Sequence, residues 1–231
     1  GSNILVSDDG YQGAVIVLGR EFQRTVIAED GVHVTVGAAT VLSRLVNEMM
    51  SRGLSGLEFT VGIPGTVGGA VSMNAGTRRE WIGQLVESLV TYVPGEGLRY
   101  YDHDDIYWGY RETGLPGSEI VLEATLVLKP GKKDDIRERM ERYLGRRRRS
   151  QPIGKASCGS VFRNPSDKSV GAMIDDCGLK GFSVSPVHAN FIVNNGSATA
   201  KDVLSVIQHV HAKVKETYGV ELQPEVKFLG F

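Results

Sequence analysis

The residues with the clearest chemical meaning lie between Gly53 and Gly76, in the stretch GLSGLEFTVGIPGTVGGAVSMNAG. This stretch contains seven glycines and one proline, and no lysine or arginine follows until Arg78. Glycines this dense permit positive φ angles and a close approach of the backbone to a ligand. Successive main-chain N–H groups can then bind an anion without any cationic side chain. The pattern therefore favours a diphosphate, and hence a dinucleotide, as the ligand.

The alternative is a solvated glycine-rich surface loop. Apolar residues alternate with the glycines, which indicates a packed loop: Val61, Ile63, Val67, Ala70, Val71 and Met73. The stretch contains neither GxxxxGK[ST] nor a GxGxxG between a strand and a helix, so it matches neither common phosphate-binding motif.

Three further side chains could serve a reaction. Arg111 precedes the turn-forming Gly114–Gly117, and a planar guanidinium suits a carboxylate bidentately, although alone it reads as a surface-loop residue. Ser160 lies in CGSVFRNP, where a serine is a poor acid and would ordinarily be a turn or cap residue. Glu225 follows Pro224 between apolar neighbours and is either a half-exposed strand residue or a deliberately placed acid.

The segment GIPGTVGGAVSMNAG resembles the flavin-binding signature of the UDP-N-acetylenolpyruvoylglucosamine reductase family, called MurB, which acts in peptidoglycan precursor synthesis. Matches in the family's order cover essentially the whole chain: GSNILVSDDG at Gly1, YRET at Tyr110, CGSVFRNP at Cys158, HANFIVN at His188 and QPEVKFLG at Gln223. The chain lacks the long tyrosine-bearing loop of one subgroup, so it looks like the shorter, second subgroup.

The resemblance implies an α+β fold with an FAD-binding domain of the MurB/vanillyl-alcohol-oxidase type and a smaller α/β substrate-binding domain. We expect the FAD-binding domain at residues 1–130, a helical connector at 131–149 and the substrate-binding domain at 150–219. Residues 220–231 would be a tail that returns to the active site. Because the chain opens inside the first motif, an N-terminal segment of the FAD-binding domain is expected to be missing.

The implied reaction is the NADPH-dependent reduction of UDP-N-acetylglucosamine enolpyruvate to UDP-N-acetylmuramate through FAD. NADPH would reduce the flavin and leave, and the sugar nucleotide would take its place. The cofactor would lie across these positions: Gly1, Ser2, Asn3, Gly62, Ile63, Pro64, Gly65, Thr66, Gly68, Gly69, Asn74, Ala75 and Gly76.

The resemblance also assigns roles to the three reactive side chains. Arg111 would stabilise the enolate-like intermediate, Ser160 would protonate its carbon, and Glu225 would work with the arginine. The substrate would be bound by Tyr110, Asn164, Lys180 and His188. The family usually has a longer, glycine-containing loop between the last two, whereas only Gly181–Val187 separates them here. Thr113 stands where the family usually has serine and keeps the hydroxyl.

Composition agrees with a small-molecule enzyme. The 231 residues are 41% hydrophobic, and 26 basic against 27 acidic side chains give a net charge of −1, so neither nucleic acid nor a membrane is expected as a partner. We expect a cytoplasmic monomer. Cys158 and Cys177 lack CxxC spacing and are interpreted as reduced thiols without a metal. Two alternatives remain: an FAD oxidase of the vanillyl-alcohol type, and a non-catalytic flavin-binding module.

The elements that must position these groups can be predicted from periodicity. Strands are expected at 15–18, 25–28, 32–36, 85–93, 98–101, 120–128 and 190–193, with a hairpin turn at Glu29–Gly31. Thr40 is expected to cap a helix that ends at Gly53. Further helices are predicted at 134–144, at 170–177 with Gly178 as the stop, and from a capping box at Thr199 and Asp202 to Gly219.

Overall fold

The computed structural model describes residues 1–165, 168–181 and 184–231. The chain forms two compact units. The central unit is Ile16–Gly145, and the terminal unit combines Gly1–Val15 with Arg146–Phe231. These two units do not follow the domain boundary expected at residue 130. The first residues of the chain belong to the terminal unit, because they pair with the end of the chain.

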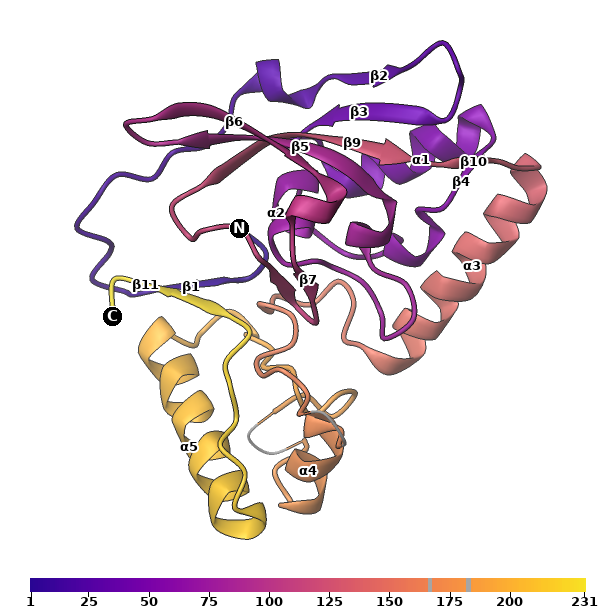
Figure 1. Cartoon of the computed structure of the whole chain (residues 1–231). Helices are drawn as coiled ribbons and strands as arrows, with labels where there is room; N and C mark the ends of the chain where they lie inside the picture. The colour runs from indigo at the N-terminus through magenta and orange to yellow at the C-terminus, as the bar shows by residue number, and fades with distance from the viewer. Residues whose placement is uncertain (166–167, 182–183) are drawn as a thin grey trace. The chain divides into compact units, whose positions relative to one another are not determined.

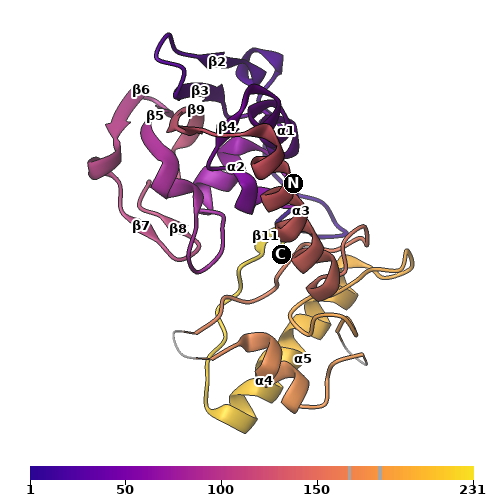
Figure 2. The ribbon, with the colours of Figure 1, turned by 90° about the vertical axis from the view of Figure 1, so that its right-hand side faces the viewer.

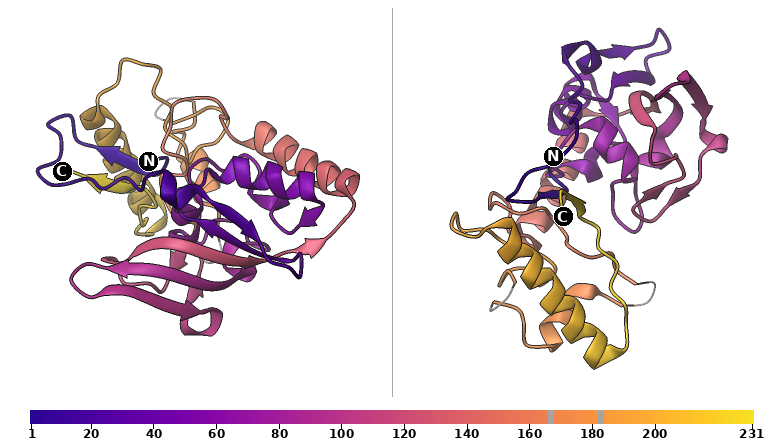
Figure 3. Two further views of the ribbon diagram at one scale, coloured as in Figure 1. Left: turned by 90° about the horizontal axis from the view of Figure 1, so that it is seen from above. Right: turned by 90° about the vertical axis from the view of Figure 1, so that its left-hand side faces the viewer.

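The central unit is built on a five-stranded antiparallel sheet (Figure 1). Its strands lie in the order β2-β3-β9-β5-β6, with bounds Thr25–Ile27, His33–Gly37, Ile120–Val127, Val86–Val93 and Gly97–Asp102. The hairpin of β5 and β6 is seen from above in Figure 3. The β5–β9 pairing shifts register near Ser88 and again near Thr91.

One face of the sheet packs on two helices, α1 (Leu42–Arg52) and α2 (Val67–Ser72), seen in Figure 2. Along β3 the valines Val34 and Val36 are fully buried, whereas His33 and Thr35, which alternate with them, are only half-buried. This alternation is the period of two that places one strand face in the core. The helices contribute Leu42, Leu45, Met49, Val67 and Val71 to the same core.

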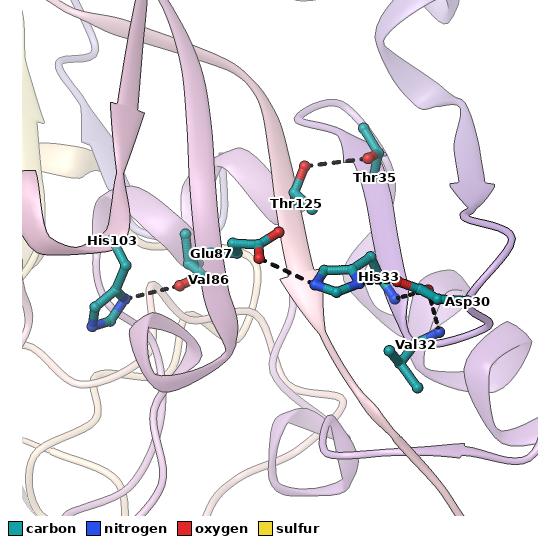
Figure 4. A network of polar contacts seen from close by, with 8 residues as sticks. All are labelled: Asp30, Val32, His33, Thr35, Val86, Glu87, His103 and Thr125. Carbon is teal, nitrogen blue, oxygen red and sulfur yellow. Dashed lines mark hydrogen bonds and ion pairs between the residues drawn. The ribbon is translucent and has the colours of Figure 1, made fainter.

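The opposite face of the sheet carries polar side chains. The His33 ring lies between two carboxylates, those of Asp30 in the β2–β3 turn and Glu87 on β5 (Figure 4). Thr35 and Thr125 share a hydrogen bond of 3.2 Å beside them. This face therefore has an ion-pair network where the other face has an apolar core.

Short elements complete the central unit. They are η1 (Arg20–Gln23), β4 (Leu54–Ser55), η2 (Glu58–Thr60), η3 (Ile82–Leu85), η4 (His103–Asp105), β7 (Trp108–Gly109), β8 (Glu112–Thr113) and β10 (Lys129–Pro130). The long helix α3 (Lys133–Ser150) begins in this unit and buries Ile136 and Met140.

The terminal unit pairs the two ends of the chain. Strand β1 (Ile4–Val6) lies parallel to β11 (Lys227–Leu229), and α4 (Val170–Asp176) packs with α5 (Ala200–Tyr218). The core of this unit includes Phe162 and Ile174. The Asp8 carboxylate accepts hydrogen bonds from the first main-chain N–H groups of α5, where the helix dipole favours an anion.

Most of the predicted elements are confirmed, and three are wrong. Residues 15–18 form no strand and are largely exposed, and 190–193 form no strand beyond the single bridge from Phe191 to Ser160. Helix α1 is capped by Val41 rather than Thr40 and has no side-chain cap, because Thr40 is buried and its main-chain groups bond to Gly37 and Val67. The capping box of Thr199 and Asp202 is present.

The described residues include neither a membrane-spanning helix nor a metal-binding cluster. No described helix combines the length and apolar character that a membrane crossing requires. The described His, Cys, Asp and Glu side chains form no cluster of three or more suited to a metal ion. Cys158 and Cys177 are free thiols, and burial raises the pKa of the Cys158 thiol.

Candidate active site

The glycine-rich signature folds as a turn, the short helix α2 and a second turn. The Thr66 hydroxyl caps α2 by accepting a hydrogen bond from Gly69 N, 3.4 Å away. Gly62 and Gly65 precede the helix with φ of 79° and 104°, which a residue with a side chain rarely adopts. The predicted packed loop is confirmed, since Val67, Ala70 and Val71 are buried, but part of it is helical.

The glycines of the signature differ in what a side chain at each position would contact. A Cβ on Gly68 would lie 2.8 Å from Ala38 Cβ, and one on Gly76 would lie 2.2 Å from the Glu80 carbonyl oxygen. A Cβ on Gly69 would meet only Thr66 Oγ1, at 3.7 Å. Gly68 and Gly76 are therefore set by packing inside the protein, whereas the surface over Gly69 is open to a ligand.

The start of the signature is fixed by a buried ion pair. The Glu58 carboxylate, 7% exposed, accepts hydrogen bonds from Arg139 of α3 at 2.8 and 3.0 Å and from Gly56 N and Ser55 Oγ. Burial alone would raise the pKa of Glu58, but these hydrogen bonds outweigh it and hold the pKa below its usual value. Tyr143, one turn further along α3, bonds to Glu80 just after the signature.

A small hairpin is hydrogen-bonded to the second half of the signature. Strands β7 and β8 pair around a two-residue turn of Tyr110 and Arg111, and β8 contacts α2 (Figure 2). The Asn74 amide donates to the Gly109 carbonyl oxygen at 2.8 Å, and the Thr113 hydroxyl donates to the Val71 carbonyl oxygen at 2.5 Å. Two side chains thus fasten the hairpin to the signature.

Arg111 lies at the tip of this hairpin with φ of 56°. Its Nη1 donates to the Gly76 carbonyl oxygen at 3.0 Å, and its guanidinium carbon lies 5.4 Å from the centre of the Tyr110 ring. The loop that follows is held by Glu119, whose carboxylate is 1% exposed and accepts from Thr91, Arg99 and Tyr101. The structure therefore brings the predicted Arg111 and Tyr110 next to the last glycine of the predicted cofactor loop.

Main-chain bonds bring Ser160 and Glu225 together in the terminal unit. Glu225 N donates to the Val161 carbonyl oxygen at 2.7 Å, and Val161 N donates to the Asn190 carbonyl oxygen at 2.9 Å. Ser160 forms an isolated bridge with Phe191. The segment after Ser160 therefore lies between Asn190 on one side and Glu225 on the other.

The first residues of the chain lie on the same segment. The Asn3 amide donates to the Glu225 carbonyl oxygen at 3.0 Å, and Lys227 N donates to the Asn3 carbonyl oxygen at 3.0 Å. Gly1 is exposed, and Ser2 is half-buried. Gly1–Asn3 thus belongs to the terminal unit, whereas the other predicted cofactor residues, Gly62–Gly76, belong to the central unit.

The predicted substrate-binding residues of the terminal unit surround α4. The side-chain Oδ1 of Asn164 accepts from Val170 N at 3.0 Å, and the His188 ring packs against Gly171 and, edge-on, Phe191. Lys180 pairs with Asp175 at 2.8 Å. Burial and then the charge of Lys180 lower the pKa of His188. Part of the Gly181–Val187 loop, residues 182–183, lies outside the described residues.

Several supporting residues were not predicted from the sequence: Arg139 for Glu58, Glu119 for the loop after the hairpin, and Asn190 for the segment of Ser160. All three bond to residues at least 18 positions away in the sequence, where no local pattern exists. Asn74 was predicted to bind the cofactor, and its side chain bonds to Gly109 and Gly83.

Comparisons with known proteins cover both units. Residues 1–93 match the family model of an FAD binding domain, and residues 151–229 match that of the UDP-N-acetylenolpyruvoylglucosamine reductase C-terminal domain. The reductase of Halalkalibacterium halodurans is 39% identical over 236 residues, which is 100% of this chain and 78% of that protein. Reductase 2 of Symbiobacterium thermophilum is 42% identical, over 100% of this chain and 76% of that protein.

A solved structure agrees with the sequence comparisons. The crystal structure of the reductase (MurB) from Thermus caldophilus matches 99% of this chain and 83% of that chain, with a TM-score of 0.87 and 40% identity. The fold is therefore the expected α+β fold of a MurB-type FAD-binding domain with a smaller substrate-binding domain. The chain belongs to the UDP-N-acetylenolpyruvoylglucosamine reductase family, and is an FAD-containing oxidoreductase.

Proposed function

We propose that NADPH is the reductant of this enzyme and that Arg111, Ser160 and Glu225 act on the enolpyruvyl group of its sugar-nucleotide substrate. The reaction of the family is the FAD-dependent reduction of enolpyruvyl-UDP-N-acetylglucosamine in peptidoglycan synthesis, and this chain carries it out. The observation that supports the residue assignment best is the bond from Arg111 Nη1 to the carbonyl oxygen of Gly76, the last residue of the signature.

The residues of the signature fit FAD. The surface over Gly69 is open, and among the described residues no acceptor is paired with the main-chain N–H groups of Gly62, Gly65 and Thr66. Backbone N–H groups of this kind suit a diphosphate. We propose that these groups hold FAD, together with Gly1, Ser2, Asn3, Ile63, Pro64, Gly68, Ala75 and Gly76. Bound FAD supplies the hydride.

The side chains of the protein manage the charge and the proton. Hydride addition to an enol ether conjugated to a carboxylate moves negative charge into that carboxylate. The planar guanidinium of Arg111 can donate hydrogen bonds to both carboxylate oxygens and so stabilise this charge as it develops. Ser160 delivers the proton to the adjacent carbon as the general acid. Glu225 acts with Arg111, and Tyr110, Asn164, Lys180 and His188 bind the rest of the substrate.

A two-step spectral experiment tests this function. NADPH added without air to the flavin-loaded protein should bleach the absorbance near 450 nm, and UDP-N-acetylglucosamine enolpyruvate should then restore it. Recovery should be stoichiometric and give UDP-N-acetylmuramate. A flavin that NADPH does not reduce, or that only oxygen reoxidises, would contradict the proposal.

We further propose that the enzyme works as a monomer in the cytoplasm. Small molecules are then its only partners. Size-exclusion chromatography with light scattering should give one mass, that of a single chain, at all concentrations. A mass that rises with concentration would contradict the monomer.

A further inference from the structure

We propose that Asn74 is a positioning residue that holds Arg111 in its reactive orientation, and that its side chain does not bind the cofactor. This inference rests on the role of Arg111 in the proposed function. The sequence placed Asn74 among the cofactor residues because it lies in the signature. The contacts of its side chain lead to the hairpin instead.

Both the nitrogen and the oxygen of the Asn74 side-chain amide form hydrogen bonds inside the central unit. The residue is 3% exposed. Its Nδ2 donates to the Gly109 carbonyl oxygen at 2.8 Å, and its Oδ1 accepts from Gly83 N at 3.0 Å. A Cβ on Gly83 would lie 2.9 Å from this Oδ1 and 2.4 Å from the Trp108 ring, so the pocket around the amide is tightly closed.

The backbone of Arg111 needs support from outside its own turn. Among the described residues, Asn74 and Arg111 are the two non-glycine residues with positive φ, at 40° and 56°. Asparagine tolerates this region because its short polar side chain can hydrogen-bond locally, whereas a long side chain such as arginine is uncommon there. A conformation of this kind persists only when its surroundings impose it. The bond from Asn74 holds Gly109, two residues before Arg111.

The two turns hold each other reciprocally. The Asn74 side chain bonds to the main chain of Gly109, and the Arg111 side chain bonds to the main chain of Gly76. Asn74 and Gly76 are two residues apart, as are Gly109 and Arg111, so the pair of bonds forms a two-point contact. Without the bond from Asn74, the hairpin keeps the bonds of Arg111 to Gly76 and of Thr113 to Val71, but Gly109 is released, and the turn can relax to a negative φ that redirects the guanidinium.

Two variants separate the side-chain bonds from the backbone conformation. Asn74→Asp keeps an acceptor for Gly83 N but replaces the donor to Gly109 with an oxygen. Asn74→Gly accepts the positive φ without strain and removes both bonds. Ser72→Ala is the matched control, because it removes another side-chain bond in the signature, the one to the Gly68 carbonyl oxygen, and does not touch the hairpin.

We expect both Asn74 variants to lose about 10²-fold in the rate of flavin reoxidation by the substrate, the cost of a misplaced catalytic group. Flavin content, the flavin spectrum and the rate of reduction by NADPH should match the wild type. Ser72→Ala should leave both half-reactions unchanged. Loss of flavin from the Asn74 variants, or normal reoxidation, would overturn the inference.

A second background tests whether Asn74 acts through Arg111. Arg111→Asn removes the guanidinium with a residue that accepts positive φ. In that background Asn74→Gly should cost no further rate, because no guanidinium is left to position. The same fold loss in both backgrounds would overturn the inference while leaving the proposed function intact. Wild-type turnover of Arg111→Asn alone would overturn the proposed role of Arg111, and this inference with it.

Discussion

The central and the terminal unit hold their candidate reactive residues in different ways. In the central unit, side chains fasten the hairpin of Arg111 to the signature, through Asn74, Arg111 itself and Thr113. In the terminal unit, main-chain bonds between Val161, Asn190 and Glu225 hold the segments of Ser160 and Glu225 side by side, and the side chains of Asn190 and Asn3 add bonds to the main chain of these segments.

This difference predicts where substitutions will matter. A main-chain ladder survives most side-chain changes, so in the terminal unit the largest effects on activity should come from the reactive side chains themselves. In the central unit, the hairpin is held partly by side chains that do not touch the substrate. Substitution of these supporting residues should therefore also lower activity.

The largest effect should come from Ser160→Ala, which removes the proton donor and leaves the ladder intact. We expect reoxidation of the flavin by substrate to slow by about 10² to 10⁴-fold. The melting temperature and the rate of reduction by NADPH should be unchanged. Stopped-flow absorbance measures both half-reactions, and Ser157→Ala, an exposed serine in the same loop, is the control. Reoxidation within about threefold of the wild type would remove Ser160 from its role.

Two neighbouring glycines should separate cofactor binding from packing. Gly69→Val places a branched side chain over the open surface of α2, so the protein should fold but purify largely without flavin. Gly68→Ala would press on Ala38 and should cost about 1–3 kcal/mol of stability. Flavin absorbance and urea unfolding measure the two effects. A fully flavin-loaded Gly69→Val protein would place the diphosphate site elsewhere.

The buried ion pair at the start of the signature should have a moderate effect. Arg139→Met leaves the buried Glu58 carboxylate without its charged partner, a loss of about 3–5 kcal/mol in a fully buried pair. Because the Arg139 side chain is 37% exposed, we expect about 2 kcal/mol in urea unfolding. Arg137→Met, which breaks the exposed pair with Asp134, should change stability by less than about 0.5 kcal/mol. If both variants lowered the free energy of unfolding equally, the burial of Glu58 would not strengthen its pair with Arg139.

The smallest effect should be the pH-dependent contribution to stability of His33, on the polar face of the sheet. The hydrogen bond to Asp30, with the charge of Glu87, raises the pKa of His33, so the folded protein binds this proton more tightly than the unfolded chain. The stabilisation is complete below about pH 6.5, the ordinary value for histidine, and is lost as pH rises through the raised pKa. His33→Gln should therefore lower the melting temperature more at pH 6 than at pH 9. A pH-independent difference would contradict this.

The sequence predicted the elements with strong local signals and missed those set by tertiary packing. The alternation in β3, the stripe of α1 and the capping box of α5 are local, and all three are confirmed. The apolar residues 15–18 were expected to form a strand, but no neighbouring strand pairs with them in the described chain. Thr40 looked like a cap but is buried, with its main chain bonded to Val67.

The candidate site shows the same limit. Motifs singled out Arg111, Ser160 and Glu225 as candidates, because their sequence neighbourhoods are distinctive. The residues that hold them could not be located in this way. Asn74 reaches across 35 positions to Gly109, and Arg139 across 81 to Glu58. Partners at such distances are chosen by the fold, which the local sequence does not encode.

The central claim is that Arg111 and Glu225 act on one intermediate, and a double-mutant cycle on the rate of flavin reoxidation by substrate tests it most directly. Arg111→Lys keeps the charge but loses the planar two-point contact, and Glu225→Gln removes the charge with little change in shape. If both groups serve one intermediate, each single variant should lower kcat and kcat/KM alike, and the double variant should be little worse than the poorer single one. A double variant whose rate loss equals the product of the two single losses would show two independent sites and contradict the account.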